Sequence, residues 1–163
     1  MLHLIPAPLH RQLYRLAYRA RQLWWRVRAP RGSGVAVVAF DEQGRVLLAR
    51  HSYGPPIWTL PGGGMARGED PQQAAIREMK EELGCGLADL TAIDAGEEPI
   101  AGSHNTRHII VARLVGEPVP DMREVVAVAF VDPKDLPEHC GRRSRAWLAQ
   151  AVTYRRAKAS QQR

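Results

Sequence analysis

The feature that most constrains this chain is an expected helix whose polar face carries three glutamates. Glu78, Glu81 and Glu82 are related by i,i+3 and i,i+4 spacing, and like charges at this spacing destabilise an isolated helix. Apolar residues recur on the opposite side of the same helix: Ala75, Ile76, Met79 and Leu83. A divalent cation, which takes several carboxylate oxygens at once, would offset the repulsion. The pattern therefore predicts a metal-binding face on a helix packed against a core.

The residues around these glutamates give the helix defined ends and a loop that can approach a ligand. Asp70 is suited to cap the first turn and Pro71 to occupy it, while Gly84 can end the helix in the left-handed conformation. The sequence thus predicts a helix over residues 71–83. The glycines at 62–64 would let the backbone come close to a ligand.

The whole stretch from Gly63 to Cys85 resembles the Nudix box. That pattern asks for Gly, five residues, Glu, seven residues, Arg-Glu, an aliphatic residue, any residue, Glu-Glu, any residue, Gly and an aliphatic residue. The chain supplies every polar and glycine position without a gap: Gly63, Glu69, Arg77, Glu78, Glu81, Glu82 and Gly84. Met79 and Cys85 stand where Ile, Leu or Val is usual, and both are apolar. The resemblance extends over roughly residues 33–138.

The resemblance implies an α/β/α sandwich around a mixed β-sheet. It also implies hydrolysis of a nucleoside diphosphate linked to another group, with Mg²⁺ or Mn²⁺ neutralising the pyrophosphate and activating water. The implied metal ligands are three glutamates and a backbone carbonyl: Glu78, Glu81, Glu82 and Gly63. Glu69 would support the glycine loop or bind an outer metal. Arg77, which can pair with Glu81 at i,i+4, would orient a glutamate.

The resemblance leaves open which residue takes the proton from water. The base comes either from the box, where Glu78 and Glu81 are candidates, or from a later loop. The later candidates are Glu97, Glu98 and Glu124. For each of them a solvated loop acid is favoured over the role of base. Glu124 is the best of the three, because it precedes the last expected strand and can swing towards the metal ions.

Five residues around the glycine loop are candidates for substrate contact: Arg50, Tyr53, Trp58, Gly62 and Gly64. Arg50 can hold phosphate, while Tyr53 and Trp58 can stack on a base. Surface charge for Arg50 and a core position for Trp58 are the alternatives. For His51, surface placement is favoured over a phosphate contact. For three further residues the sequence leaves the substrate side and surface placement equally open: His104, Arg107 and His108.

The identity of the substrate depends on residues outside the box. Pro99 lies near the place where ADP-ribose hydrolases of this family tend to carry a proline. Dinucleoside-polyphosphate hydrolases tend to carry a tyrosine there, and none occurs between Cys85 and Val115. The first expectation is therefore an ADP-ribose-like substrate, followed by a nucleoside triphosphate or an RNA 5′ end. A non-catalytic nucleotide sensor would be expected to carry a broken box, and this box is intact.

The net charge of +6 is divided unevenly along the chain. Residues 1–31 hold seven arginines and residues 141–163 hold seven Lys/Arg, in both cases without an acid, so the middle carries −8. An acidic core suits metal binding, and the basic flanks could bind the core, nucleic acid or an anionic membrane. We divide the chain into an N-terminal basic amphipathic helix and linker (1–31), a Nudix hydrolase domain with a C-terminal helix (32–158) and a frayed tail (159–163).

The N-terminal segment predicts a helix from about Leu9 to Val27, rich in Arg, Tyr and Trp. Docking on its own domain, or on a second copy in a homodimer, is favoured over a membrane-surface helix, and a targeting peptide is a third alternative. The two cysteines are far apart in the sequence, which favours a reducing compartment. No apolar run approaches the roughly 20 residues of a membrane span. The expected location is cytoplasmic, with peripheral membrane association through residues 1–31 as a variant.

The rest of the chain alternates strand patterns with turns. Ala29 to Gly34 is expected to be a linker, and residues 117–121 a loop. A final helix is expected over 144–157. Strands are expected over 35–40, 45–50, 58–60, 90–95, 107–115 and 125–131.

Overall fold

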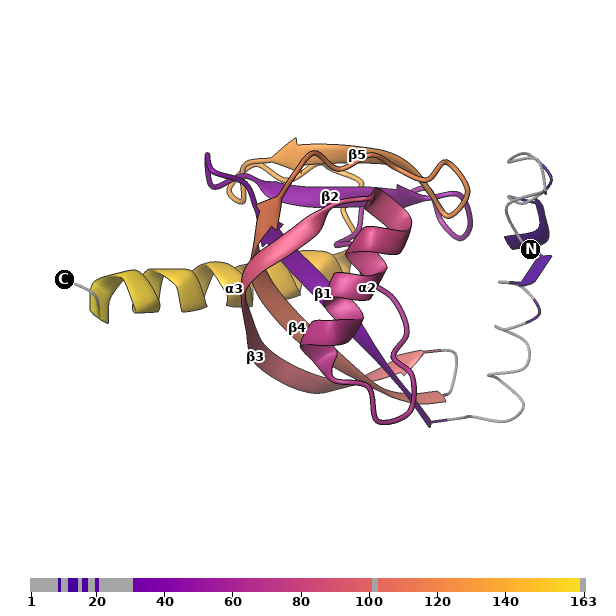
Figure 1. The fold of residues 1–163 in the computed structure, drawn as a ribbon, viewed down its shortest axis with the longest axis horizontal. Helices are drawn as coiled ribbons and strands as arrows, with labels where there is room; N and C mark the ends of the chain where they lie inside the picture. The colour runs from indigo at the N-terminus through magenta and orange to yellow at the C-terminus, as the bar shows by residue number, and fades with distance from the viewer. Residues whose placement is uncertain are drawn as a thin grey trace.

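A computed structural model describes residues 31–100 and 103–161, together with residues 9, 12–14, 16, 17 and 20. The chain order of the elements is β1 (Arg31–Phe40), β2 (Val46–His51), α2 (Pro71–Leu83), β3 (Gly86–Ile100), β4 (Ser103–Val115), β5 (Val125–Val131) and α3 (Arg142–Gln161). Figure 1 shows the strands forming one strongly twisted sheet with helices around it.

The five strands form one mixed sheet in the order β3-β4-β1-β2-β5. Strands β1 and β4 run parallel, whereas the pairs β1–β2, β2–β5 and β3–β4 are antiparallel. Since β1 and β4 are separated in the chain by α2, the parallel pair is closed by a crossover that contains the helix. The expected mixed sheet is confirmed.

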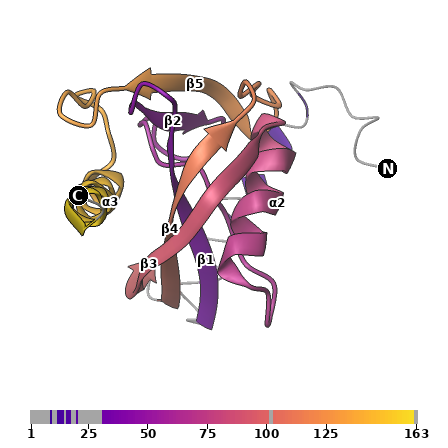
Figure 2. The same ribbon diagram turned by 60° about the vertical axis from the view of Figure 1, so that its left-hand side comes forward.

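The two helices cover opposite faces of the sheet, and the alternation of side chains along β1 explains how. Val35, Val37 and Ala39 share one core with buried residues of α2, including Met79 and Leu83. The intervening residues of β1 face a second core that includes Leu148 and Ala151 of α3: Ala36, Val38 and Phe40. Figure 2 shows α2 and α3 on the two sides of the sheet. The α/β/α sandwich is therefore also confirmed.

Several elements are longer than expected. Strand β1 begins at Arg31, so the prediction that residues 31–34 form part of a linker was wrong. They form a strand because they pair with β4 from His104 onwards, and because Gly34 also pairs with Gly64 of the glycine loop. Strand β3 covers Gly86–Ile100 rather than 90–95.

The C-terminal helix α3 is also longer than expected. It covers Arg142–Gln161, so residues 159–161 are helical instead of frayed. The segment at 58–60 contributes isolated bridges, from Trp58 to Cys140 and from Thr59 to Ala49, and not a full strand.

The helix expected from Leu9 to Val27 lies mostly outside the described residues. Residues 9, 12–14, 16, 17 and 20 are helical, and the others are not described. Leu9, Leu13 and Leu16 are exposed. None of the helices within the described part of the chain is long and apolar enough to cross a membrane.

Candidate metal and phosphate site

Helix α2 forms as expected because both of its ends are capped. The Asp70 carboxylate accepts hydrogen bonds from the backbone N–H groups of Gln72 (2.9 Å) and Gln73 (3.1 Å). At the other end Gly84 has φ 62°, and its N–H donates to the Lys80 carbonyl. Helix α2 therefore presents one fixed face to the core and its neighbouring face to the loops that follow β2 and precede β5.

The glycine loop before α2 is packed so closely that two of its residues have no room for a side chain. A Cβ on Gly62, whose φ is +132°, would lie 2.3 Å from the Val35 carbonyl oxygen. A Cβ on Gly63 would lie 2.5 Å from the carboxyl carbon of Glu78. The Glu78 carboxylate therefore lies directly on the Gly63 backbone, and glycine is required there for that contact.

Arg77 connects the loop, the outlying glutamate and the helix. Its guanidinium donates to both oxygens of Glu69 (2.9 and 3.1 Å), to Glu78 Oε1 (2.7 Å) and to the Gly64 carbonyl (2.9 Å). The expected pair with Glu81 is the longest of its contacts, at 3.4 Å. These contacts fit the orienting role expected of Arg77. The glutamate that Arg77 holds most closely is Glu78 and not Glu81.

Both carboxylate oxygens of Glu69 accept hydrogen bonds from the loop and from Arg77. Its Oε2 also accepts the Ala66 N–H at 2.7 Å, so both oxygens are engaged. The hydrogen bonds from Arg77 and then Ala66 lower the pKa of Glu69 below its ordinary value. Of the two roles implied for Glu69, the geometry fits support of the loop.

Glu82 lies in a different environment from the other glutamates of the box. Its side chain was expected on the polar face of α2, yet Glu82 is only 5% exposed. Burial, followed by the negative charges of Glu124, Glu78, Asp121 and Glu81, raises the pKa of Glu82 to about 9. Burial also raises the pKa of Glu78, whereas the Glu81 side chain is 62% exposed. The electrostatic cost is therefore concentrated at Glu82, where burial contributes more than the neighbouring carboxylates.

Two residues outside the box face Glu82. One ligand atom each of His51, Glu82 and Glu124 lies within 4.8 Å of the others. Burial lowers the pKa of His51, which keeps its imidazole neutral at neutral pH. Oε2 of Glu82 and Nδ1 of His51 are buried without a hydrogen-bond partner in the described structure. A buried carboxylate and a neutral imidazole with vacant lone pairs fit a divalent metal ion.

Glu124 reaches Glu82 because its loop is tied to the end of α2. The backbone N–H groups of Val119 and Asp121 donate to the carbonyls of Leu83 and Glu82, at 2.8 and 3.0 Å. Oδ1 of Asp121 in turn accepts the N–H groups of the three residues that follow Met122: Arg123, Glu124 and Val125. This loop therefore brings Glu124, one of the later acids considered as a general base, next to Glu82.

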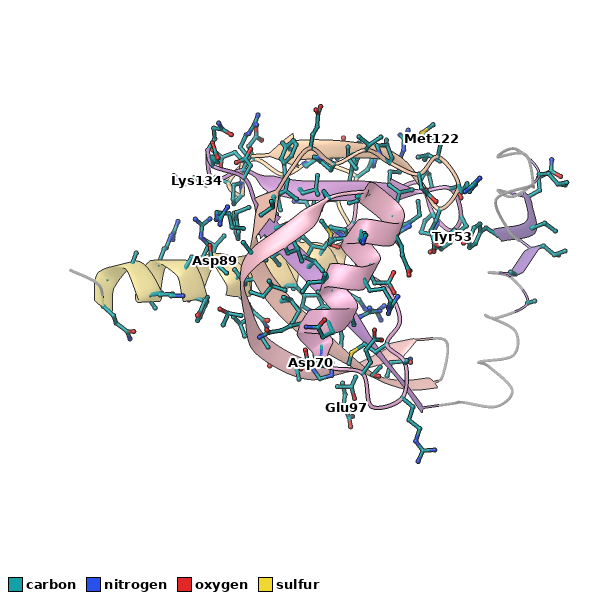
Figure 3. The ribbon with its side chains drawn as sticks, viewed as in Figure 1. Tyr53, Asp70, Asp89, Glu97, Met122 and Lys134 are labelled. Carbon is teal, nitrogen blue, oxygen red and sulfur yellow. The ribbon has the colours of Figure 1, made fainter. Side chains whose placement is uncertain are left out.

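Tyrosine side chains surround the Glu124 carboxylate. The Tyr53 hydroxyl donates to Glu124 Oε1 at 2.6 Å. The ring of Tyr14, from the N-terminal segment, stacks on Tyr53 with centroids 5.8 Å apart. Burial and then Glu124 raise the pKa of Tyr14 to about 12. Figure 3 shows Tyr53 and Met122 at the same end of the sheet, beside the N-terminal residues and away from Asp70 and Glu97.

The remaining predicted site residues lie elsewhere. The guanidinium of Arg50 lies over the Trp58 ring at 5.5 Å, and Trp58 packs against the core on the α3 side of the sheet. The Gly63 carbonyl already accepts the Val35 N–H (2.9 Å) and Arg107 Nη1 (3.3 Å), which weighs against its expected role as a metal ligand. Glu97 lies on β3, away from Glu124, and the side chain of Glu98 is outside the described residues.

Arg107 also lines a pocket of about 200 Å³ between the sheet and α3. Its guanidinium lies 5.8 Å from the centre of the Trp147 ring, and Glu97 and Arg143 line the same pocket. The pocket meets the glycine loop through Arg107, which donates to the Gly63 carbonyl. The sequence leaves Arg107 open between the substrate side and the surface and expects Trp147 on the apolar side of the last helix; it does not bring the two together, because the pocket is formed by strands and a helix far apart in the chain.

His51 lies where the sequence does not place it. Surface placement is the favoured expectation, with a phosphate contact as the alternative, whereas the structure places its imidazole beside Glu82 and Glu124. The ladder between β2 and β5 shifts its register between Arg50 and His51, so the alternation that would place the side chain is interrupted there. The only sequence signal for this position of His51 is that a polar residue stands just before a loop and has aromatic neighbours.

The fold and the site together define a class: an α/β/α sandwich in which a glycine loop, an arginine-held helix and a loop glutamate form one carboxylate-rich site. The NUDIX domain family model matches residues 30–154, which includes every one of these parts. The chain belongs to the NUDIX family.

Comparison with individual proteins agrees with this assignment. The chain is 42% identical over 67 residues to an RNA pyrophosphohydrolase of Rhodospirillum rubrum, and the match spans 41% of each chain. It is 30% identical over 105 residues to a provisionally named 8-oxo-dGTP diphosphatase of Bacillus subtilis, which covers 64% of this chain and 68% of that protein. The chain spans only about two-fifths of the first RNA pyrophosphohydrolase that it matches.

Solved structures show the same fold. A MutT NUDIX hydrolase from Burkholderia pseudomallei is 28% identical, with a TM-score of 0.65 over 74% of this chain and 97% of that one. An Ap4A hydrolase from C. elegans has the same TM-score at 23% identity, covering 77% of this chain and 98% of that one, a likeness of fold alone.

Proposed function

We propose that this protein hydrolyses a phosphoanhydride bond of a nucleotide, using a divalent metal ion bound at Glu82 and Glu124. The observation that carries the proposal is the Glu82 carboxylate, which is buried, faces Glu124 and has an oxygen without a partner in the described structure. A carboxyl group in this position is costly unless a cation or a proton compensates it. Mg²⁺ or Mn²⁺ would supply that charge, together with Lewis acidity towards water and phosphate oxygens.

The neighbouring residues have separate tasks in this proposal. Arg77 holds Glu78 against the glycine loop, so the carboxylate has one fixed position beside the substrate. Burial raises the pKa of Glu78 towards the range in which a general base works best at neutral pH. Because Glu124 is held by Tyr53 and faces Glu82, we assign Glu124 to metal binding and Glu78 to proton transfer. The exposed Glu81 would contribute a further ligand or a water contact.

The substrate side of the proposal rests on the pocket beside the loop. Arg107 lines that pocket and also donates to the Gly63 carbonyl, so we take the pocket as the candidate place for a nucleoside. The names of the relatives refer to RNA and to 8-oxo-dGTP. We therefore place nucleoside 5′-triphosphates, free or at an RNA end, ahead of the ADP-ribose-like substrate expected from the sequence.

A panel of substrates tests the proposal. Nucleoside triphosphates, ADP-ribose, dinucleoside polyphosphates and 5′-triphosphorylated RNA are incubated with Mg²⁺ or Mn²⁺, and the products are identified by mass. We expect cleavage at a phosphoanhydride bond, and its loss by at least 100-fold in Glu82→Gln. Glu117→Gln, which removes an exposed acid from the same loop region as Glu124, is the matched control. Metal-independent turnover, or normal turnover in Glu82→Gln, would contradict the metal assignment.

RNA is a second candidate substrate because of the basic C-terminal helix. Helix α3 carries three exposed cations near its end: Arg155, Arg156 and Lys158. Cations that contact phosphates release counterions, so RNA affinity should fall steeply between 50 and 200 mM salt. We expect the triple alanine variant at these positions to weaken RNA binding and leave the turnover of a mononucleotide unchanged. Absence of RNA binding at low salt would remove this candidate.

A further inference from the structure

The cluster at the end of β2 contains a nitrogen donor as well as carboxylates. His51, Glu82 and Glu124 each place one ligand atom within 4.8 Å of the other two. Two donors on opposite sides of one ion are separated by about 4.4 Å when each bond is about 2.2 Å. The 4.8 Å upper limit on the observed separations lies slightly above this value, so the three atoms enclose a space about the size of one coordination sphere.

Two polar atoms of this cluster are buried without partners. Oε2 of Glu82 and Nδ1 of His51 accept no hydrogen bond within the described part of the chain, and Glu82 is only 5% exposed. An unpaired buried polar group costs about 1–3 kcal/mol, and a charged group costs more. Two such atoms on side chains that face each other fit a bound cation, which would accept a lone pair from each of them.

The backbone holds His51 in this position from both sides. The β2–β5 register shifts between Arg50 and His51, and the next residue then attaches β2 to the loop before β5. The Ser52 N–H donates to the Glu124 carbonyl at 2.8 Å, and the Ser52 hydroxyl donates to the Arg123 carbonyl at 2.6 Å. The two hydrogen bonds from Ser52 thus hold the end of β2, with His51, beside the loop that carries Glu124. Such a tie keeps two side chains from separate segments close enough to bind one ion.

We propose that His51 is an inner-sphere nitrogen ligand of the metal ion shared by Glu82 and Glu124, and that the site consequently prefers Mn²⁺ to Mg²⁺. The inference deepens the proposed function, on which it rests, because it completes the ligand set of the same metal site. Mg²⁺ favours oxygen ligands and retains its waters, whereas imidazole suits the first-row transition ions. A site of one imidazole and two carboxylates should therefore bind Mn²⁺ more tightly than Mg²⁺, because the nitrogen ligand suits only Mn²⁺.

The test measures metal binding directly by electron paramagnetic resonance of Mn²⁺ in the full chain. We expect pulsed spectra of the wild type to show coupling of Mn²⁺ to a ¹⁴N nucleus. We expect Mn²⁺ to bind at least tenfold more tightly than Mg²⁺, measured by competition. In His51→Gln the nitrogen coupling should disappear and Mn²⁺ affinity should fall about tenfold, with less than a threefold change for Mg²⁺. The exposed His139 provides the control variant His139→Gln, which should retain the coupling.

The outcomes separate this inference from the proposed function. Mn²⁺ binding without nitrogen coupling in the wild type would overturn the role of His51, and this measurement does not depend on how any variant folds. Equal affinity for Mg²⁺ and Mn²⁺ would overturn the selectivity. Either result leaves metal-dependent hydrolysis intact if Glu82→Gln is still inactive. Failure to bind either ion would overturn both proposals.

Discussion

Replacing Glu82 by glutamine should make the metal-free protein more stable at neutral pH, although it removes a residue that we assign to the active site. In the folded chain the pKa of Glu82 is raised from 4.5 to about 9, mainly by burial. Below pH 4.5 the carboxyl group is protonated in both the folded and the unfolded state, so its titration has no effect on stability there. Above this pH only the unfolded chain releases the proton readily, and the folded state loses stability as the pH rises to about 9.

The size of this effect follows from the pKa difference. Each pH unit between the two pKa values changes the free energy of unfolding by about 1.4 kcal/mol. At pH 7 the raised pKa of Glu82 should therefore lower the free energy of unfolding of the wild type by about 3 kcal/mol, compared with a chain in which Glu82 keeps its ordinary pKa. Between pH 5 and pH 8 the wild type should lose about 4 kcal/mol relative to Glu82→Gln. A loss of stability at a residue needed for activity is the direction expected of a stability–activity trade-off.

Urea denaturation in the presence of EDTA at pH 5, 6, 7 and 8 measures this difference. The control is Glu81→Gln, which removes the same charge from the same helix at a side chain that is 62% exposed. We expect the control to follow the pH dependence of the wild type. Adding Mn²⁺ should stabilise the wild type and leave the stability of Glu82→Gln nearly unchanged, because only the wild type retains the Glu82 carboxylate that binds the ion. Parallel stability curves for the wild type and Glu82→Gln would refute the argument that a buried, unpaired carboxylate lies at this position.

Three further substitutions test the geometry around α2. Gly63→Ala should lower turnover at least 100-fold, measured as kcat, because the new Cβ would lie 2.5 Å from the Glu78 carboxyl carbon. Arg77→Lys should lower kcat at least tenfold with an unchanged circular dichroism spectrum, because lysine cannot reproduce the two-oxygen contact with Glu69. Tyr53→Phe should weaken Mn²⁺ binding several-fold in a titration, because it removes the 2.6 Å hydrogen bond to Glu124. A wild-type value in any of these assays would contradict the corresponding contact.

Features that depend on residues close in sequence could be predicted before the structure was seen. The ends of α2 follow from Asp70 and Gly84, whose capping is local chemistry, and α2 covers the expected range. Strand β5 matches its expected range at Val125–Val131, because a continuous apolar run between polar loops leaves few alternatives. The mixed sheet came from the resemblance, since no local pattern specifies the order of strands.

Features that depend on distant contacts could not be predicted. Residues 31–34 contain two glycines and therefore resemble a linker, yet Gly34 pairs with both Arg107 of β4 and Gly64. The burial of Glu82 likewise depends on the loop before β5 and not on the pattern of α2. The position of His51 depends on an interruption in a strand ladder, and such interruptions have no reliable signal in a single sequence.

The backbone tie between the end of α2 and the loop of residues 117–124 has a consequence for how relatives of this protein are recognised. Val119 and Asp121 fix the distance from that loop to the helix, and Glu124 owes its position to them. An insertion or deletion in this loop would move Glu124 away from Glu82 without altering a single residue between Gly63 and Cys85. Under the proposed function, a relative with a perfect box but a different length of this loop would lack the Glu124 ligand, and the length of the loop would be a second criterion for separating active from inactive members.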